Sequence, residues 1–165
     1  ALTEALSNRD FKPAARSWAA IALDENFASH AASWIASGNA AAPTVAALTE
    51  ALSVEDDQVK LRMLSTLCNI LNMAWERSTI INIGNGAGKV AAALTGALSG
   101  KDSKVKAKAA RALGQILGER SGDFPDFGNA TAKAVIALTE TLTHDDDYSS
   151  KANAARALGA ILGRR

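Results

Sequence analysis

Basic side chains recur at one position of a repeated triplet, and their chemistry suits the binding of anions. The triplet Ala-Ala-Arg occurs three times and ends at Arg16, Arg111 and Arg156. Lys104 and Lys108 precede Arg111 at helical spacing, so the three side chains would share one face of a helix. A guanidinium group is planar and always charged, which suits pairing with carboxylates and phosphates. The pattern predicts a shallow surface for an acidic or phosphorylated ligand; the alternative is an ordinary solvated helix face.

The local charge favours the same prediction. Between residues 101 and 111, five cations face one carboxylate, a balance of +4. The cations are Lys101, Lys104, Lys106, Lys108 and Arg111, and the carboxylate is Asp102. The whole chain has a formal net charge of only +1 and 5% aromatic residues. Because nucleic-acid surfaces are strongly basic and often interleave aromatics, a nucleic-acid partner is disfavoured.

Three other groups with reactive side chains have structural explanations. His144 is followed by Asp145, Asp146 and Asp147, but neighbours in a turn rarely converge on one ion and no calcium-loop spacing is present. The glycine-rich run at residues 84–89 lacks the Gly-Lys-Ser/Thr ending of a phosphate loop, and no strand precedes it. The lone Cys68 has no obvious histidine partner and is expected in the core. The sequence therefore assigns no catalytic residue, no metal and no cofactor.

A phrase of six residues repeats four times and sets the elements that position these side chains. Its copies begin at Leu2, Leu48, Leu94 and Leu138, with spacings of 46, 46 and 44 residues. A Gly-Asn pair stands ten residues ahead of each of the last three copies. A period of this length indicates a tandem array of helical units. We expect one repeat domain over residues 1–165, with units at about 1–37, 38–83, 84–127 and 128–165.

Each unit is expected to contain two helices with apolar stripes. In the first helix the stripe recurs at i, i+3 and i+7, as in Val45, Leu48 and Leu52. The matching sets are Ala91, Leu94 and Leu98, and Val135, Leu138 and Leu142. The second helix carries the stripes Val59, Met63, Leu67 and Ile70, and Val105, Ala109, Ala112, Leu113 and Ile116.

The ends and contacts of the second helices can also be predicted. A polar turn precedes each of them and supplies a capping carboxylate from Asp10, Asp56, Asp102 or Asp146. Gly114 and Gly159 keep one position small, which would let neighbouring helices approach closely. Short third helices are expected at Phe27–Ser37 and Ala74–Ile83, and an irregular connector at Glu119–Asn129.

The composition agrees with an all-α protein. Hydrophobic residues make up 48% of the chain, alanine is abundant, and no apolar run reaches the roughly 18 residues of a membrane span. The lone cysteine favours a reducing compartment, cytoplasmic or nuclear. Residue 1 is an alanine inside a repeat phrase, so we expect a fragment or a processed chain. Its end faces should then be apolar, with Ile161 and Leu162 packing against a further unit, and should favour end-to-end self-association.

The pattern resembles the armadillo and HEAT superfamily over nearly the whole chain. Ile35 to Gly38 and Ile81 to Gly84, each followed by Val-x-x-Leu-x-x-x-Leu, are similar to an armadillo unit. Asp102 to Lys106, followed by Ala110 to Gly114, resembles a HEAT second helix equally well. The resemblance implies a right-handed α-α superhelix of about four units, with the second helices lining the inner surface. It leaves the choice between the two subtypes open.

One property of the superfamily does not transfer to this chain. Armadillo nuclear-import receptors line their inner surface with Trp and Asn one turn apart. The matching pairs here are Ser65 and Asn69, Arg111 and Gln115, and Arg156 and Ala160. Recognition of basic localisation peptides is therefore disfavoured. Trp18, Trp34 and Trp75 align with core or connector positions and are expected to pack.

The sequence therefore predicts a non-catalytic scaffold that binds an acidic or phosphorylated protein segment along the second helices. Arg111 and Arg156 would be the principal contacts, with Lys104, Lys108 and Asn69 in support. The alternative is an enzyme or enzyme subunit on a similar solenoid, as in bilin lyases or DNA-base glycosylases of that architecture. Such an enzyme would need a polar catalytic cluster, which the sequence does not show. No membrane partner is expected.

Overall fold

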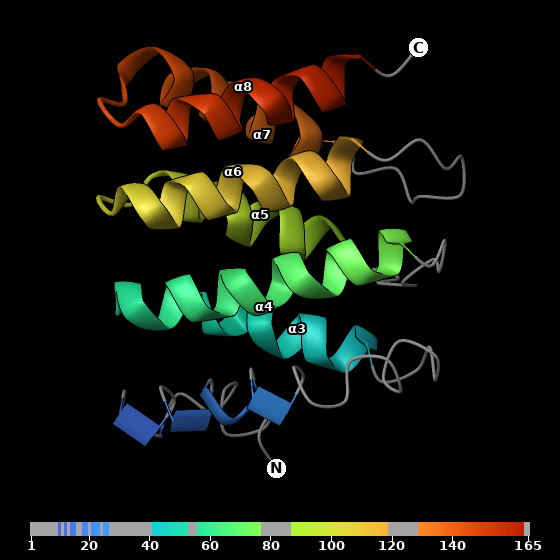
Figure 1. The fold of residues 1–165 in the computed structure, drawn as a ribbon, viewed down its shortest axis with the longest axis vertical. Helices are drawn as coiled ribbons and strands as arrows, with labels where there is room; N and C mark the ends of the chain where they lie inside the picture. The colour runs from blue at the N-terminus through green and yellow to red at the C-terminus, as the bar shows by residue number, and fades with distance from the viewer. Residues whose placement is uncertain are drawn as a thin grey trace. The chain divides into compact units, whose positions relative to one another are not determined.

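The described residues of the computed structural model form helices joined by short turns. They comprise residues 41–52, 56–76, 87–118 and 129–163, together with separate positions between residues 10 and 26. The helices are α3 (Ala41–Ala51), α4 (Asp57–Glu76), α5 (Ala87–Leu98), α6 (Ser103–Gly118), α7 (Asn129–His144) and α8 (Tyr148–Leu162) (Figure 1). No strand occurs within these ranges, so the all-α prediction is confirmed for them. None of the helices described is both long and apolar enough to span a bilayer.

The chain divides into two compact units, Ala1–Gly86 and Ala87–Arg165. The division falls close to the expected boundary between the second and third repeats. In the first unit, α3 packs against α4. In the second unit, α5 packs on α6 and α7 on α8, while α6 also contacts α8 and α5 contacts α7. The second unit therefore has two layers, one of first helices (α5 and α7) and one of second helices (α6 and α8), as Figure 1 shows.

The first helices bury the stripe that their periodicity predicts, with one difference. Val45, Leu48 and Leu52 are buried in α3, and the matching residues of α5 are buried as well. In α7, Leu138 is fully buried but Val135 and Leu142 are only half-buried. The difference follows from the stacking of the first helices. α7 packs on α5 and covers its residues, whereas no further first helix among the described residues covers α7.

The second helices confirm the predicted stripes. Every predicted stripe residue of α4 and α6 is buried, from Val59 to Ile116. Cys68 is buried too, as expected of a small core residue. The apolar stripe therefore fixes which face of each second helix points away from the core.

Side-chain caps begin these helices, and one predicted cap is wrong. Asp56 accepts from the backbone N–H of Gln58 at 2.8 Å, and Asp102 accepts from that of Val105 at 2.9 Å. For α8 the cap is Asp147, whose Oδ2 accepts from Ser150 N at 2.7 Å, and not Asp146. Between the third and fourth repeats, the Ala-Ala-Arg triplets lie 45 residues apart while the six-residue phrases lie 44 apart. The turn between the two helices thus gained one residue, which moves the cap to Asp147.

The prediction of a close helix contact holds for one of the two glycines. A Cβ added to Gly114 would lie 2.9 Å from the Ala157 Cα of α8, so only glycine fits there without a shift. A Cβ added to Gly159 would meet nothing within 4 Å. Gly159 is the equivalent position of α8, and no other described second helix packs on that side of α8.

Several expectations fall on segments outside the described residues. The connector prediction Phe27–Ser37 belongs to this group, as does most of Ala74–Ile83. The predicted irregular connector Glu119–Asn129 also lies outside the described residues except for Asn129, which begins α7. The residues from Ala74 to Glu76 belong to α4 rather than to a separate helix. The expectation of packing is wrong for Trp18, whose side chain is 71% exposed; the side chains of Trp34 and Trp75 lie outside the described part.

Candidate functional site

Three of the predicted cations lie on one face of α6, here called the basic face. The apolar stripe of α6 is buried, including Val105 and Ile116, which turns the side of the helix that carries Lys104, Lys108 and Arg111 outward. Lys104 and Arg111 are exposed and Lys108 is half-buried. Their spacing places them on successive turns.

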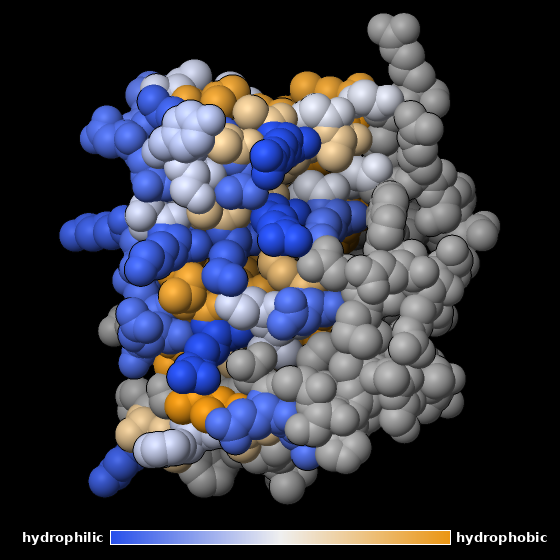
Figure 2. All heavy atoms as spheres, in the orientation of Figure 1, coloured by the Kyte–Doolittle hydropathy of each residue, from blue (hydrophilic) through white to orange (hydrophobic). Residues whose placement is uncertain are grey.

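Arg156 extends the basic face onto the neighbouring helix. It is exposed on α8, which packs directly on α6. Arg111 and Arg156 occupy the same position of the repeat, so the stacking of the two helices puts both guanidinium groups in the layer of second helices. In Figure 2 strongly hydrophilic groups lie over both α6 and α8, among paler and apolar ones.

Asn69, the remaining predicted contact, belongs to the other compact unit. It is exposed on α4. The structure therefore groups Lys104, Lys108, Arg111 and Arg156 within one unit and assigns Asn69 to the other.

One cation of the predicted excess does not contribute to the basic face. Lys106 lies on a different side of α6, and its Nζ is 2.9 Å from Asp145 Oδ2, with side-chain exposures of only 21% and 9%. The Lys106 ammonium, as a hydrogen-bond donor, holds the pKa of the Asp145 carboxyl below its ordinary value. The local balance of +4 therefore overstates the charge available to a partner.

Two further polar residues occupy the repeat position of Lys108, which the sequence analysis did not follow along the chain. Arg62 is exposed on α4, 46 residues before Lys108, and 46 is the spacing between the second and third repeats. Asn153 occupies the same position on α8, and its Nδ2 donates to Ser149 O at 2.8 Å. The repeat period identifies both residues in the sequence when the spacing is counted from Lys108 and not only from the Ala-Ala-Arg triplet.

The acidic cluster after α7 has local structural roles. Asp147 caps α8, Asp145 pairs with Lys106, and His144 Nδ1 lies 2.8 Å from Thr143 Oγ1. Among the described residues, no group of three or more His, Cys, Asp or Glu side chains is arranged to hold a metal ion.

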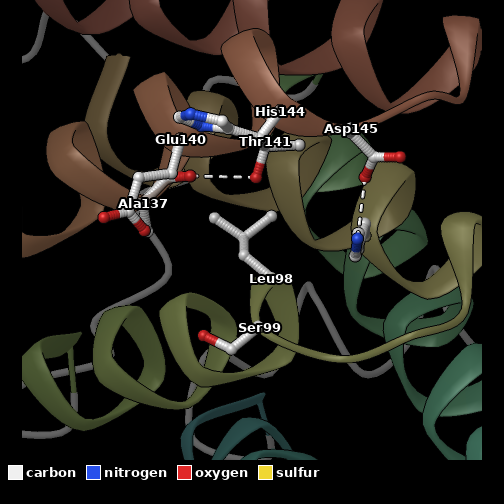
Figure 3. A pocket seen from close by; sticks show the side chains of 8 residues that line it. Leu98, Ser99, Ala137, Glu140, Thr141, His144 and Asp145 are labelled. Atoms are coloured by element: carbon white, nitrogen blue, oxygen red, sulfur yellow. Dashed lines mark hydrogen bonds and ion pairs between the residues drawn. The ribbon is translucent and has the colours of Figure 1, made fainter.

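A pocket of about 180 Å³ lies beside this cluster, between the ends of α5 and α7. Leu98 occupies its centre in Figure 3, with Ser99 below and Thr141 above. The Thr141 hydroxyl donates to Ala137 O at 2.9 Å, and the Lys106–Asp145 pair lies at one edge. Thr141, Lys106 and Asp145 thus have partners within the fold, and the pocket is a gap at a helix junction.

The stacked helical pairs define the class of protein, and the comparison with protein families gives the family. The family of HEAT repeats matches residues 45–159, which is well over half of the chain. The chain therefore belongs to the HEAT repeat family, whose repeats as a class mediate protein–protein interaction. Comparison with curated proteins and with solved structures gives no significant match.

Proposed function

We propose that this chain is a non-catalytic protein-interaction scaffold that binds an acidic or phosphorylated protein segment on the basic face. The observation that carries the proposal is the exposure of Arg111 and Arg156 at one repeat position of two helices that pack together. A guanidinium pair of this kind can donate hydrogen bonds to two carboxylates or phosphates along an extended segment. Lys104 and Lys108 add charge on the same side of α6.

The wider form of the proposal uses the whole array. In a right-handed superhelix of about four units, the second helices line one continuous inner surface. Asn69 and Arg62 of α4 would then add polar contacts to the same segment. The protein partner would lie in the cytoplasm or the nucleus.

A double charge reversal tests the proposal. We would measure binding of labelled peptides rich in glutamate or phosphoserine to the parent chain and to the Arg111→Glu, Arg156→Glu variant. We expect affinity to fall by about tenfold or more, equivalent to about 1.4 kcal/mol, because attraction is replaced by repulsion. Circular dichroism and thermal midpoint should hardly change, since exposed substitutions usually alter stability by less than about 0.5 kcal/mol.

The chain offers a matched control. Lys89 and Lys133 are exposed on the first helices α5 and α7, so their double reversal to glutamate changes the net charge equally but leaves the basic face intact. Binding by this control should fall far less, and binding by the parent should weaken as salt rises, because screening acts within about 8 Å at physiological ionic strength. Equal losses in both variants would show only a general charge effect, and an unchanged affinity in the Arg111, Arg156 variant would refute the proposal.

A further inference from the structure

Arg111 shows that its repeat position stays exposed when another second helix packs alongside. α8 packs directly on α6, yet the Arg111 side chain of α6 remains exposed. The position therefore lies outside the contact between the two helices, on the solvent side of their layer. Arg156 holds the same position on α8 and is exposed as well. A single ligand can thus approach both guanidinium groups from one side of the layer.

The charges of both arginines are uncompensated by neighbouring side chains. Residues 107–115 around Arg111 and residues 152–160 around Arg156 contain no Asp or Glu. Neither guanidinium makes a hydrogen bond or an ion pair with another described residue. Lys106 differs, because Asp145 already pairs with it at 2.9 Å. The five N–H donors of each arginine are therefore available to a ligand from outside the described residues.

The surface between the two arginines is built from residues with very small side chains. α6 and α8 approach closely where Gly118 meets Ala160, since a Cβ added to Gly118 would lie 2.6 Å from the Ala160 Cβ. Ala160 is exposed and Gly118 is half-buried, so this contact, here called the seam, reaches the surface. Because no atom beyond a Cβ rises from either residue, an extended main chain can cross the seam from α6 to α8 at close range.

The stacking also sets the separation of the two arginines. The axes of packed helices lie about 8–10 Å apart, and equivalent residues on them are separated by a similar distance. A polyproline II segment brings every third side chain to the same face, about 9 Å apart. In a β-strand, side chains on one face repeat about every 7 Å. The separation of Arg111 and Arg156 therefore matches anionic side chains three positions apart in a polyproline II segment.

We propose that the partner segment crosses the seam in an extended conformation and presents two anionic side chains, glutamate or phosphoserine, three positions apart. One anion binds Arg111 and the other binds Arg156, each through the fork of the guanidinium group. This inference rests on the proposed function and adds the direction and the spacing of the bound segment. The competing course runs along α6 from Arg111 to Lys104, which lie about 10 Å apart along the helix axis, and would leave Arg156 unused.

Peptides of equal charge and different spacing test the proposal. Otherwise identical, uncharged peptides would carry two anionic side chains at i and i+1, at i and i+3, or at i and i+6, in one glutamate and one phosphoserine series. Fluorescence anisotropy measures their affinity for the full chain. In the series that binds more tightly, the i and i+3 peptide should bind at least about fivefold more tightly than the other two, because only this spacing engages both arginines at once.

Single neutralisations establish which cations the pair of anions uses. Arg156→Gln should remove the advantage of the i and i+3 peptide, so that the three spacings bind alike. Lys104→Gln should weaken all three peptides while the advantage persists, because Lys104 lies away from the seam. An advantage that survives Arg156→Gln and disappears in Lys104→Gln would overturn the proposal in favour of the course along α6. Circular dichroism of each variant establishes that it is folded.

The same measurements separate this inference from the proposed function. If the three spacings bind the parent equally and the Arg111→Glu, Arg156→Glu variant loses that binding, the crossing is refuted while the basic face remains the binding surface. If no peptide of either series binds the parent, or if the double reversal leaves their binding unchanged, both the crossing and the proposed function are refuted.

Discussion

Asp145 and Lys106 show how a residue in an acidic run acquires a specific structural role. The carboxylate lies in the turn between α7 and α8, and Lys106 reaches it from α6. Asp145 Oδ1 also accepts from the backbone N–H of Asp147 at 3.1 Å. One side chain therefore joins the turn before α8 to the neighbouring repeat, and its two partners are charged or backbone donors that stabilise the ionised form.

Replacing Asp145 by Asn should destabilise the protein in a pH-dependent way. Because the pKa of Asp145 is lowered in the folded state, its contribution is present above the unfolded pKa of about 3.9 and is lost as the pH falls through the folded pKa. Urea denaturation at pH 7 should show a loss of about 1–3 kcal/mol, since the mostly buried Lys106 ammonium loses its partner. The difference from the parent should shrink below about pH 4. The exposed neighbour variant Asp146→Asn is the control; a difference that stays constant with pH would contradict the pairing.

The helix cap at α8 gives a second residue-scale prediction. Asp147→Ala should cost about 1 kcal/mol of folding free energy, because the Ser150 N–H loses its acceptor at the helix start. Asp146→Ala should have little effect, since Asp146 is exposed and precedes the cap. Thermal unfolding of the two variants side by side measures both; equal losses would show that the cap position is not specific.

At the scale of elements, the contact between α6 and α8 depends on small residues at defined positions. Gly114 faces the Ala157 backbone, and Gly118 faces Ala160. Both contacts involve groups that cannot rotate away, so the separation of the two helices is fixed by backbone and Cβ atoms. This separation also sets how far the helix that carries Arg111 lies from the one that carries Arg156.

Alanine at the two equivalent glycines should change stability in opposite directions. Gly159→Ala meets open space and should add about 0.5–1 kcal/mol, because alanine has the higher helix propensity. Gly114→Ala gains the same propensity but overpacks against Ala157, which typically costs about 1–3 kcal/mol and should prevail. Chemical denaturation at low protein concentration gives both values. Stabilisation by Gly114→Ala would mean that α8 shifts without cost.

At the scale of the whole molecule, stability should be distributed among repeats instead of residing in one central core. Each of the two compact units has its own fully buried leucines, such as Leu48 in α3 and Leu138 in α7. In repeat proteins each unit gains its stability from itself and its direct neighbours. A substitution in the core of one unit should therefore destabilise mainly that unit.

Amide hydrogen exchange of two truncation variants tests this distribution. Leu138→Ala should cost about 2–5 kcal/mol at its own site and should lower protection mainly within Ala87–Arg165. Leu48→Ala should do the same mainly within Ala1–Gly86. Equal loss of protection across the whole chain in both variants would instead indicate a single cooperative unit.

The sequence by itself determined the helical class, the repeat period and the buried stripes, because these depend on local spacing that repeats along the chain. It also identified Arg111 and Arg156 as equivalent positions, and both are exposed on packed helices. Only the tertiary structure decided that Lys106 pairs with Asp145, that Asp147 caps α8, and that Gly114 is in contact while Gly159 is open. These outcomes depend on which helix lies next to which, because identical sequence motifs acquire different surroundings when one faces a neighbouring helix and the other faces no described helix.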